Sequence, residues 1–597
     1  MGRKMMDTPR SRREFFRDLS AVSAGLVVAV HLPACAQSRW PIPNPVDRGD
    51  GSVKPSSLDD PGFMPNAFLR VTTDDRIIFV LARTEMGQGV YTSETMLVAE
   101  ELNIDPAEIE IVAAPAHRAY VNPMLKMQIT GASSSTRTSF EPLRAAAAVV
   151  REALVGAGAA KWGVPPSEVR LKGKVVIHQA SKRKVQIGTL AVAARDFVDD
   201  EAKPKPRSQW KLLGTSPRRL DAQQKVNGTA QYGADVDLPG LEVAVVMHGP
   251  TGSRLMGFDA GSALDSPGVK AVFAIEAGVA VVAERYDQVR KAADKVKVEW
   301  SPSEVSSAGL LDEYSRRIAD DDLSTARSDG DVGEVLESAS EIISAEYRFP
   351  FLAHMALEPM TATAWVKENH TCEIWAPTQS TAACAWAGSH AGGVRRDDVT
   401  VHQTFIGGGF GRKSYVDVVL EAAEISKVRR APVRVLWSRE DDVQCDAFRP
   451  ATVHRIRAVM NDKRPVAWQH ATVGQTALFT EGRKETLTEL VPEFMTGVVL
   501  WGARTFSGAP SLVEGSKQLR YDIPNIEVKY AVADEVVHTG IWRSVGHSQN
   551  AFVLETFIDE LATRAGEDPY RFRRDLLSKS PRHLGVLDLA AEKAGWG

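Results

Sequence analysis

The chain has 597 residues, of which 44% are hydrophobic and 25% charged, and its formal net charge is -4. This is ordinary globular composition, and the length allows several domains with separate cores. A slightly acidic chain lacks the surplus of basic residues that general nucleic-acid binders carry, so we expect no nucleic-acid partner.

The N-terminus carries a targeting pattern. Residues 11–16 read Ser-Arg-Arg-Glu-Phe-Phe and precede an apolar run, residues 19–32. That run is too short to span a bilayer comfortably, since about 20 residues are needed. The pattern is typical of a twin-arginine export peptide, which carries proteins folded around a cofactor. It predicts a signal peptide over residues 1–36 and a periplasmic mature protein.

The end of this signal can be interpreted in two ways. Ala34-Cys35-Ala36 fits signal-peptidase cleavage after Ala36, whereas residues 32–35, Leu-Pro-Ala-Cys, resemble a lipoprotein box that would anchor Cys35 to a lipid and give peripheral membrane association. An uncleaved helix in a cytoplasmic protein is a third alternative. Residues 37–64 are rich in Pro, Ser and Asp and predict an extended tether.

Four polar or glycine-rich loops each precede a helix-like run. The first follows a strand-like segment, residues 76–82, and reads Glu-Met-Gly-Gln-Gly-Val at residues 85–90, before a helix expected over 95–102. The second is Thr-Gly-Ala-Ser-Ser-Ser-Thr-Arg at 130–137, before a helix over 142–154. The third and fourth cover residues 405–413 and 541–549.

Between the second and third loops the chain changes character. Residues 203–207, Lys-Pro-Lys-Pro-Arg, predict a solvated linker. Strands are expected over residues 243–248 and 269–275, and a helix over 286–296. The acidic, polar residues 320–333 predict a surface crossing between domains.

The third loop reads Phe-Ile-Gly-Gly-Gly-Phe-Gly-Arg-Lys, after a strand expected over 399–404 and before a helix over 416–427. Glycines let the backbone approach a ligand, and a strand-to-helix position aims free N–H groups and the helix dipole at negative charge. The loop therefore predicts an anion cradle, with a tight structural turn as the alternative. Its spacing fits neither the Rossmann pattern nor Walker A.

The fourth loop reads Ile-Trp-Arg-Ser-Val-Gly-His-Ser-Gln and precedes a helix expected over 551–564. In this order and wording the four loops resemble the molybdopterin-binding subunit of the xanthine dehydrogenase superfamily, in the branch of isoquinoline 1-oxidoreductase beta subunits and membrane-associated aldehyde dehydrogenases. Residues 218–222, 353–360 and 375–379 also resemble family segments, and the likeness runs from about Ala67 to the C-terminus.

The resemblance implies an α+β, large multidomain molybdopterin-binding fold with an inserted α/β hammerhead domain. It places the first molybdopterin-binding portion at residues 65–202, the hammerhead at 210–302 and the second portion at 335–597. The residues that it assigns to cofactor binding are Gln88, Gly89, Ser133, Ser134, Ser135, Gly408, Gly409, Phe410, Gly411, Arg543 and Gln549.

Six of these residues have structural alternatives. Gln88, implied to donate its amide to a molybdenum oxo ligand, could cap its helix, and the three serines could do the same. Phe410 could be ordinary core, and Arg543 could be half of a buried ion pair.

The resemblance implies molybdopterin in its cytosine dinucleotide form. Because the pterin itself holds the molybdenum, the protein is expected to supply no metal ligand. Beyond Cys35 the chain has only Cys372, Cys384 and Cys445, without a Cys-x-x-Cys pair, so it predicts no four-cysteine iron–sulfur cluster and no covalent haem. These cysteines are interpreted as buried small hydrophobes, with one disulfide as the alternative. The resemblance implies a small [2Fe–2S] partner subunit, a c-type cytochrome beyond it, and an N-heteroaromatic or aldehyde substrate.

Two departures from the family pattern concern carboxylates. Ser414 follows Lys413 where purine-oxidising members have a glutamate, and no Gly-Glu-x-Gly segment with the general-base glutamate follows Gln549. Glu567 lies in an expected helix-ending turn, and Glu358 is interpreted as a cap or ion pair. We therefore leave the catalytic residue unknown and expect an incomplete C-terminal portion. A split enzyme, a non-catalytic cofactor-binding or scaffold remnant, and an unstable fragment remain as alternatives.

Overall fold

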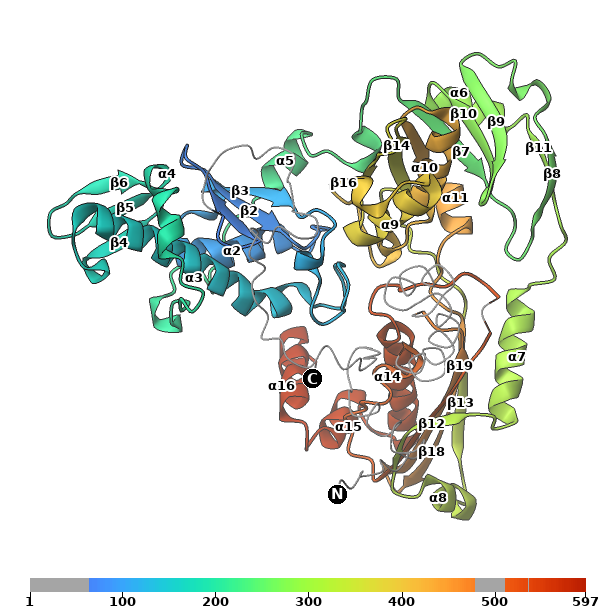
Figure 1. Cartoon of the computed structure of the whole chain (residues 1–597). Helices are drawn as coiled ribbons and strands as arrows, with labels where there is room; N and C mark the ends of the chain where they lie inside the picture. Colours follow the sequence, from blue (N-terminus) through green and yellow to red (C-terminus); the bar gives the residue numbers. More distant parts are fainter. Residues whose placement is uncertain (1–63, 478–510, 535, 597) are drawn as a thin grey trace, which may run out of the picture. The chain divides into compact units, whose positions relative to one another are not determined.

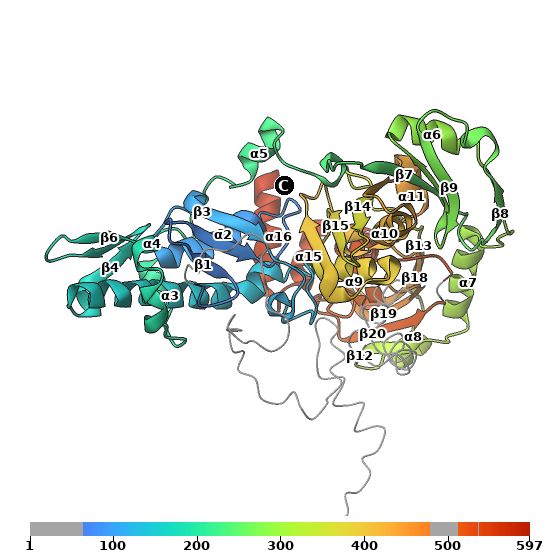
Figure 2. The same cartoon turned by 45° about the horizontal axis from the view of Figure 1, so that its top comes forward.

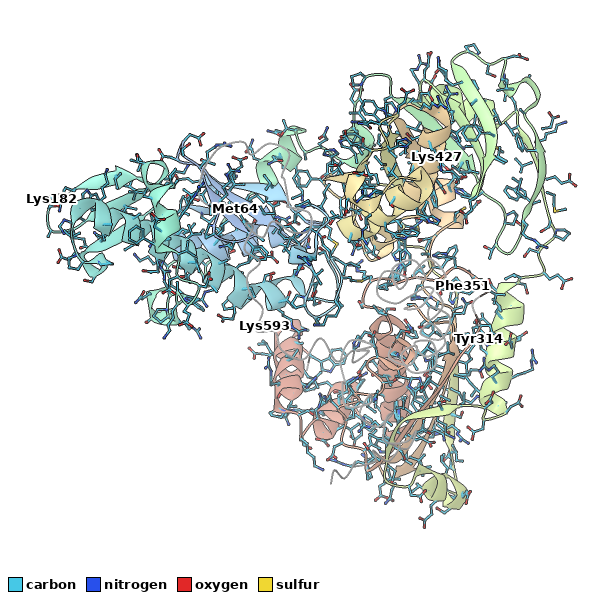
Figure 3. The ribbon with its side chains drawn as sticks, viewed as in Figure 1. Met64, Lys182, Tyr314, Phe351, Lys427 and Lys593 are labelled. Carbon is cyan, nitrogen blue, oxygen red and sulfur yellow. The ribbon has the colours of Figure 1, made fainter. Side chains whose placement is uncertain are left out.

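The computed structural model describes residues 64–477, 511–534 and 536–596, beginning at Met64 (Figure 3). The predicted signal peptide, Cys35 and the tether up to residue 63 lie outside the described residues. The chain forms two compact units. Unit 1 comprises residues 1–236 and 366–407, and unit 2 comprises residues 237–365 and 408–597.

Unit 1 combines short sheets with two long helices. Its elements are β1 (Leu69–Val71), β2 (Ile77–Leu81), α2 (Val90–Leu102), β3 (Ile109–Ala113), α3 (Ser135–Trp162), β4 (Val169–Lys172), β5 (Val175–His178), β6 (Lys184–Gln186), α4 (Ile187–Leu190), α5 (Ala222–Asn227), β15 (Cys372–Ala376), α9 (Thr381–Gly392) and β16 (Val399–Gln403).

The core of unit 1 forms around α3, which lies beside α2 and the β4–β5–β6 sheet (Figure 1). Its run of alanines favours a helix and lets neighbouring elements approach closely. The helix begins at Ser135, seven residues before the start that the sequence suggested, and Pro142 lies inside it. It ends at Gly163, whose φ of 63° is the left-handed conformation of a glycine cap.

Strand order in unit 1 follows simple ladders. β1 and β2 are antiparallel, β2 and β3 are parallel, and β15 and β16 are parallel. The predicted strand over 76–82 is thereby confirmed. The solvated linker predicted over 203–207 is wrong only in part. Three of its five residues are exposed, but the Lys205 amide donates to the buried Glu101 carboxylate at 2.9 Å and the Lys205 ammonium donates to Asn103 Oδ1 at 2.7 Å.

Unit 2 contains the remaining elements. They are β7 (Glu242–Met247), β8 (Leu255–Asp259), β9 (Val269–Ile275), β10 (Gly278–Ala283), α6 (Tyr286–Ala293), β11 (Lys297–Trp300), α7 (Ser307–Ala319), β12 (Ser324–Asp329), α8 (Val332–Ser338), β13 (Ile343–Phe349), β14 (Thr361–Val366), α10 (Asp417–Arg429), β17 (Val433–Leu436), α11 (Arg439–Gln444), β18 (Thr452–Asn461), β19 (Arg464–Gly474), β20 (Asn525–Val532), α14 (His547–Ala565), α15 (Pro569–Leu576) and α16 (Pro581–Ala594).

A five-stranded sheet in the order β12-β20-β19-β18-β13 organises the C-terminal half of unit 2. Helix α14 covers one face and α7 the other (Figure 1). Alternate residues along β18 and β19 explain both layers, since Ile456 and Trp468 pack toward α14 whereas Val453 and Val473 pack toward α7. Tyr314, labelled in Figure 3, is the fully buried residue of α7.

The segment with the predicted hammerhead pattern pairs β7 with β10 and β10 with β9, all antiparallel, and α6 packs against these strands (Figure 2). The two strands expected there are confirmed as β7 and β9, and the helix as α6, which ends at Ala293. The surface crossing expected over 320–333 is wrong in part, because residues 324–329 form edge strand β12 on β20. No described helix is long and apolar enough to cross a membrane.

Candidate functional site

The glycine loop, residues 405–413, presents an aromatic ring, and its residues from Gly408 onward begin the second segment of unit 2. Gly408 and Gly411 have φ of 99° and 109°, and Phe410 between them has φ of 56°, a conformation uncommon outside glycine. The Phe410 side chain is 40% exposed, so the interpretation as ordinary core is wrong. The N–H groups of Gly408, Gly409 and Phe410 make no hydrogen bond with the described residues.

One detail of the predicted anion cradle is wrong. The loop does not open α10 directly, because a single 3-10 turn, Arg412–Ser414, intervenes and the helix is capped at Val416. The dipole of α10 therefore starts several residues beyond the glycines, and the donors of this loop are its own strained backbone rather than a helix terminus.

The Arg543 loop, residues 541–549, lies against the glycine loop. The Arg543 N–H donates to the Phe410 carbonyl at 2.8 Å, and its guanidinium carbon is 5.2 Å from the centre of the Phe410 ring. Arg543 is exposed, so the interpretation as a buried ion pair is wrong. Ser544 and Val545 follow with φ of 62° and 49°, and a β-branched residue at positive φ marks strain of the kind that concentrates at functional sites.

A buried charged network underlies this pair of loops. Arg412, 1% exposed, lies 2.8 Å from Asp446 and 2.6 Å from Asp417. The ring of His354 reaches Asp446 through Nδ1 at 3.0 Å and the Ile541 carbonyl through Nε2 at 2.9 Å. Asp446 thus joins Arg412 of the glycine loop, through His354, to Ile541, the first residue of the Arg543 loop.

Next to this network, Lys413 and Glu358 form an ion pair. The Lys413 ammonium lies 3.3 Å from the Glu358 carboxylate and also donates to the Pro359 carbonyl at 3.2 Å. Burial lowers the pKa of Lys413, and the nearby Glu358 charge opposes that shift. Of the two roles expected for Glu358, helix cap or ion pair, the ion pair is confirmed.

Gln549 is the last residue of the Arg543 loop. It lies in the first turn of α14, is 3% exposed, and accepts from the Ser548 hydroxyl at 2.7 Å. With Trp542, Gly546 and Arg449 it lines a cavity of about 10 Å³, room for roughly one water molecule. Arg449 was not expected from the sequence; burial lowers its pKa, and its guanidinium contacts the Trp542 ring at 5.6 Å.

The Gln88 loop, residues 85–90, belongs to unit 1. The Gln88 side chain is exposed and bonds to its own loop, since Nε2 donates to the Thr84 carbonyl at 2.8 Å and Oε1 accepts from the Met86 N–H at 2.7 Å. The N-cap of α2 is Gly89, with φ of 89°, so the interpretation of Gln88 as a helix cap is wrong. The side-chain amide has a second N–H that remains available for a ligand.

Glu85 is the residue of this loop whose role the sequence did not reveal. Its carboxylate accepts the N–H groups of Gly87 at 2.8 Å, Gly89 at 3.1 Å and Tyr91 at 2.9 Å. The amide of Gly89 is therefore engaged within the chain, and its predicted cofactor contact stays a prediction. An acid shortly before a helix-like run was the available signal.

The serine loop, residues 130–137 of unit 1, buries the side chain of its central Ser134. Ala132 and Ser133 have φ of 54° and 50°. Ser134 is fully buried, accepts from Asn122 Nδ2 at 2.5 Å and donates to the Gly131 carbonyl at 2.6 Å. Its side chain makes no capping bond to α3, so the cap alternative is wrong for Ser134. Ser133 is exposed and Ser135 is half-buried, and both remain candidates for a ligand.

Gln379 and Gln403 take part in hydrogen bonds that connect the Gln88 loop to the serine loop. Gln379 Nε2 donates to the Thr130 carbonyl at 2.9 Å, and the Thr130 hydroxyl accepts from the Thr84 N–H at 2.8 Å. Gln403 Nε2 donates to the Thr84 hydroxyl and the Thr378 carbonyl. These residues line a polar cavity of about 10 Å³ in unit 1. Gln403 was not singled out by the sequence.

Two segments of the chain, residues 50–245 and 312–577, match the molybdopterin cofactor-binding domain. The chain belongs to the molybdopterin-binding subunits of the xanthine dehydrogenase family. The Gln88 and serine loops fall in the first matched segment, and the glycine and Arg543 loops in the second. The predicted resemblance and the predicted α+β multidomain fold are thereby confirmed.

Relatives within the family place the chain more closely. The isoquinoline 1-oxidoreductase subunit beta of Brevundimonas diminuta is 29% identical over 89% of this chain and 72% of its own length. The membrane-bound aldehyde dehydrogenase [pyrroloquinoline-quinone] of Gluconacetobacter polyoxogenes is 26% identical over 98% of this chain and 76% of its own length. Relatives of this family are oxidoreductases, and the chain is an oxidoreductase subunit of the family.

A solved structure supports the fold. Quinoline 2-oxidoreductase from Pseudomonas putida 86 superimposes with a TM-score of 0.50 at 18% identity, over 64% of this chain and 54% of that chain. The chain thus spans about half the length of this structural neighbour.

The described residues fit a molybdopterin cofactor. The exposed Phe410 ring, the unbonded amides of residues 408–410 and the exposed Arg543 guanidinium offer stacking and donor groups for a phosphate-bearing pterin. Among residues 64–477, 511–534 and 536–596, no group of three His, Cys, Asp or Glu side chains could hold a metal ion. The donors of the glycine and Arg543 loops suit an anionic, oxygen-rich ligand.

Two of the three described cysteines have the expected buried packing, and Cys445 does not. Cys372 and Cys384 are buried, and burial raises the pKa of each thiol to about 12. Such thiols are inert small hydrophobes. Cys445 is half-buried and, like the other two, free within the described part of the chain.

Proposed function

We propose that this chain is the large molybdenum-cofactor subunit of a periplasmic hydroxylase that acts on an N-heteroaromatic, isoquinoline-like substrate or on an aldehyde. The contact between the glycine loop and the Arg543 loop carries the proposal, because it joins free backbone donors, an exposed aromatic ring and an exposed cation in one place. The names of the relatives supply the substrate classes.

In this proposal each loop has a distinct task. When bound, molybdopterin supplies a molybdenum centre able to hydroxylate an electron-poor carbon and to take up the electrons. The amides of Gly409 and Phe410 would hold oxygens of the cofactor, and the Phe410 ring would exclude water from it. Arg543 would neutralise negative charge. In unit 1, the second N–H of Gln88 would be available to an oxygen of a ligand.

The cofactor form, the partners and the location extend the same proposal. We propose the cytosine dinucleotide form of molybdopterin. The cysteine inventory gives the chain no usual cluster of its own, so electrons leave through a small [2Fe–2S] subunit and from there to a c-type cytochrome. The twin-arginine pattern at residues 11–16 supports export to the periplasm, and lipid attachment at Cys35 would add peripheral membrane association.

The test uses the complex purified from the periplasm of cells that express this chain with its genetic neighbours. Addition of isoquinoline or a simple aromatic aldehyde should bleach the visible absorption of the [2Fe–2S] subunit. Arg543→Gln should lower the bleaching rate, whereas Arg571→Gln, which removes an exposed charge on α15, should not.

The other outcomes separate the alternatives. A complex that holds molybdenum but bleaches with neither substrate would favour a non-catalytic cofactor-binding or scaffold role. A complex that contains pyrroloquinoline quinone and no molybdenum would contradict the proposal, and would agree with the cofactor in the name of the Gluconacetobacter relative.

A further inference from the structure

We infer that Arg219 is a positioning residue that holds the Gln88 loop in its ligand-binding conformation through Glu85. The inference rests on the proposed function, because it concerns how the chain presents Gln88 to the cofactor. All the contacts that carry it lie within unit 1.

The Glu85 carboxylate occupies the N-terminus of α2. Its Oε1 accepts from Gly87 at 2.8 Å and Gly89 at 3.1 Å, and its Oε2 accepts from Tyr91 at 2.9 Å. Donors at a helix N-terminus ordinarily attract an anionic ligand, but here an anion of the chain itself has taken them. This loop therefore offers a ligand the side chain of Gln88 rather than those amides.

Arg219 fixes this carboxylate from the far side. Its Nη2 donates to Glu85 Oε1 at 2.9 Å, and its Nη1 donates to the Gly87 carbonyl at 2.9 Å. One planar guanidinium thus donates both to the Glu85 carboxylate and to the carbonyl of Gly87, the residue before Gln88. A lysine, with a single ammonium, cannot span both acceptors in the same way.

Arg219 is itself held by a fully buried acid. Asp221 accepts from Arg219 Nε at 3.0 Å and Nη2 at 2.8 Å, and from Lys225 at 2.6 Å. The backbone next to Arg219 is anchored as well, since the Leu220 N–H donates to the Thr92 hydroxyl on α2 at 3.0 Å. The negative charges of Glu85 and Asp221 balance the positive charges of Arg219 and Lys225. These contacts hold the Arg219 guanidinium in one position against the loop.

Amide hydrogen exchange tests the clamp in the full chain prepared without cofactor. Arg219→Gln should speed exchange at Gly87, Gly89 and Tyr91 by about 10-fold or more, the scale of a lost charge-assisted hydrogen bond. Arg219→Lys should restore part of the protection. Arg218→Gln is the matched control, because Arg218 is the exposed neighbour of Arg219 and forms no ion pair with the described residues. Unchanged exchange in Arg219→Gln would overturn the inference.

A double-mutant cycle then tests whether Arg219 acts through Gln88. Molybdenum retained after dialysis should fall in Arg219→Gln and in Gln88→Ala, and the double variant should lose no more than Gln88→Ala alone. Additive losses would show that Arg219 supports the fold in general and would overturn the positioning role. If the wild-type chain holds no molybdenum, the proposed function fails, and the exchange experiment still decides whether Arg219 holds the loop.

Discussion

Replacement of Gly411 by alanine should separate the glycine loop from the Arg543 loop. A Cβ at this position would lie 1.7 Å from the Ile541 carbonyl oxygen, about half of the ordinary carbon–oxygen contact distance of roughly 3.3–3.6 Å. The obstacle is backbone, so a side-chain rotation cannot relieve it. Gly411 also has φ of 109°, which alanine adopts with strain.

The magnitude follows from these two effects. Strain at positive φ alone costs about 1–2 kcal/mol. The forced shift of packed backbone adds to it and brings the total above about 4 kcal/mol, in the range of severe substitutions. Scanning calorimetry should show a large downward shift in the transition that includes unit 2, and the bound molybdenum should be lost.

Gly566→Ala provides the matched control. Gly566 ends α14 with φ of 66° and has no atom within 4 Å of an added Cβ, so it reports strain without a clash. It should lower the melting temperature by only a few degrees, and molybdenum should remain bound. If Gly411→Ala is no more damaging than Gly566→Ala, the proposed contact between the two loops is wrong.

Three further substitutions test other parts of the structure. Burial raises the pKa of Glu94 from 4.5 to about 7, so its ionisation opposes folding, and the wild-type chain should lose about 3 kcal/mol relative to Glu94→Gln as pH rises between those values; melting curves at several pH values that run parallel would contradict this. Phe557→Ala should cost about 3–5 kcal/mol because Phe557 is fully buried, whereas Phe552→Ala on the same helix, 56% exposed, should cost less than about 1.5 kcal/mol in denaturant titrations. Asp446→Asn removes the buried carboxylate that contacts both Arg412 and His354, while Arg412 keeps Asp417, and it should cost about 2–3 kcal/mol, against about 0.5 kcal/mol for the exposed Asp312→Asn; equal losses in calorimetry would refute the role of the buried network.

Local patterns allowed much of the fold to be predicted. The strand over 76–82 and the helices after the second and fourth loops carry apolar spacing and helix formers that act within a few residues. Polar β12 was interpreted as a surface crossing because an edge strand shows little alternation of apolar residues, and its partner β20 lies about 200 residues further along the chain.

The candidate site was predicted as loops but not as a network. The glycine, Gln88, serine and Arg543 loops could all be predicted from their residue sequences and from their positions before helix-like runs. Glu85 and Arg219 are 134 residues apart, and His354 and Asp446 are 92 apart, so no local pattern could pair them. The inward turn of Ser134 and the bonding of Gln88 to Thr84 likewise depend on contacts that spacing does not encode.

The most direct test of the central claim is the molybdenum and organic phosphate content of the purified chain, expressed from residue 1 with or without its genetic neighbours. We predict close to one molybdenum atom per folded chain, accompanied by cytosine nucleotide on acid release, and loss of both in Gly411→Ala. A folded wild-type chain that contains neither molybdenum nor pterin phosphate in either preparation would contradict the claim that these loops hold molybdopterin.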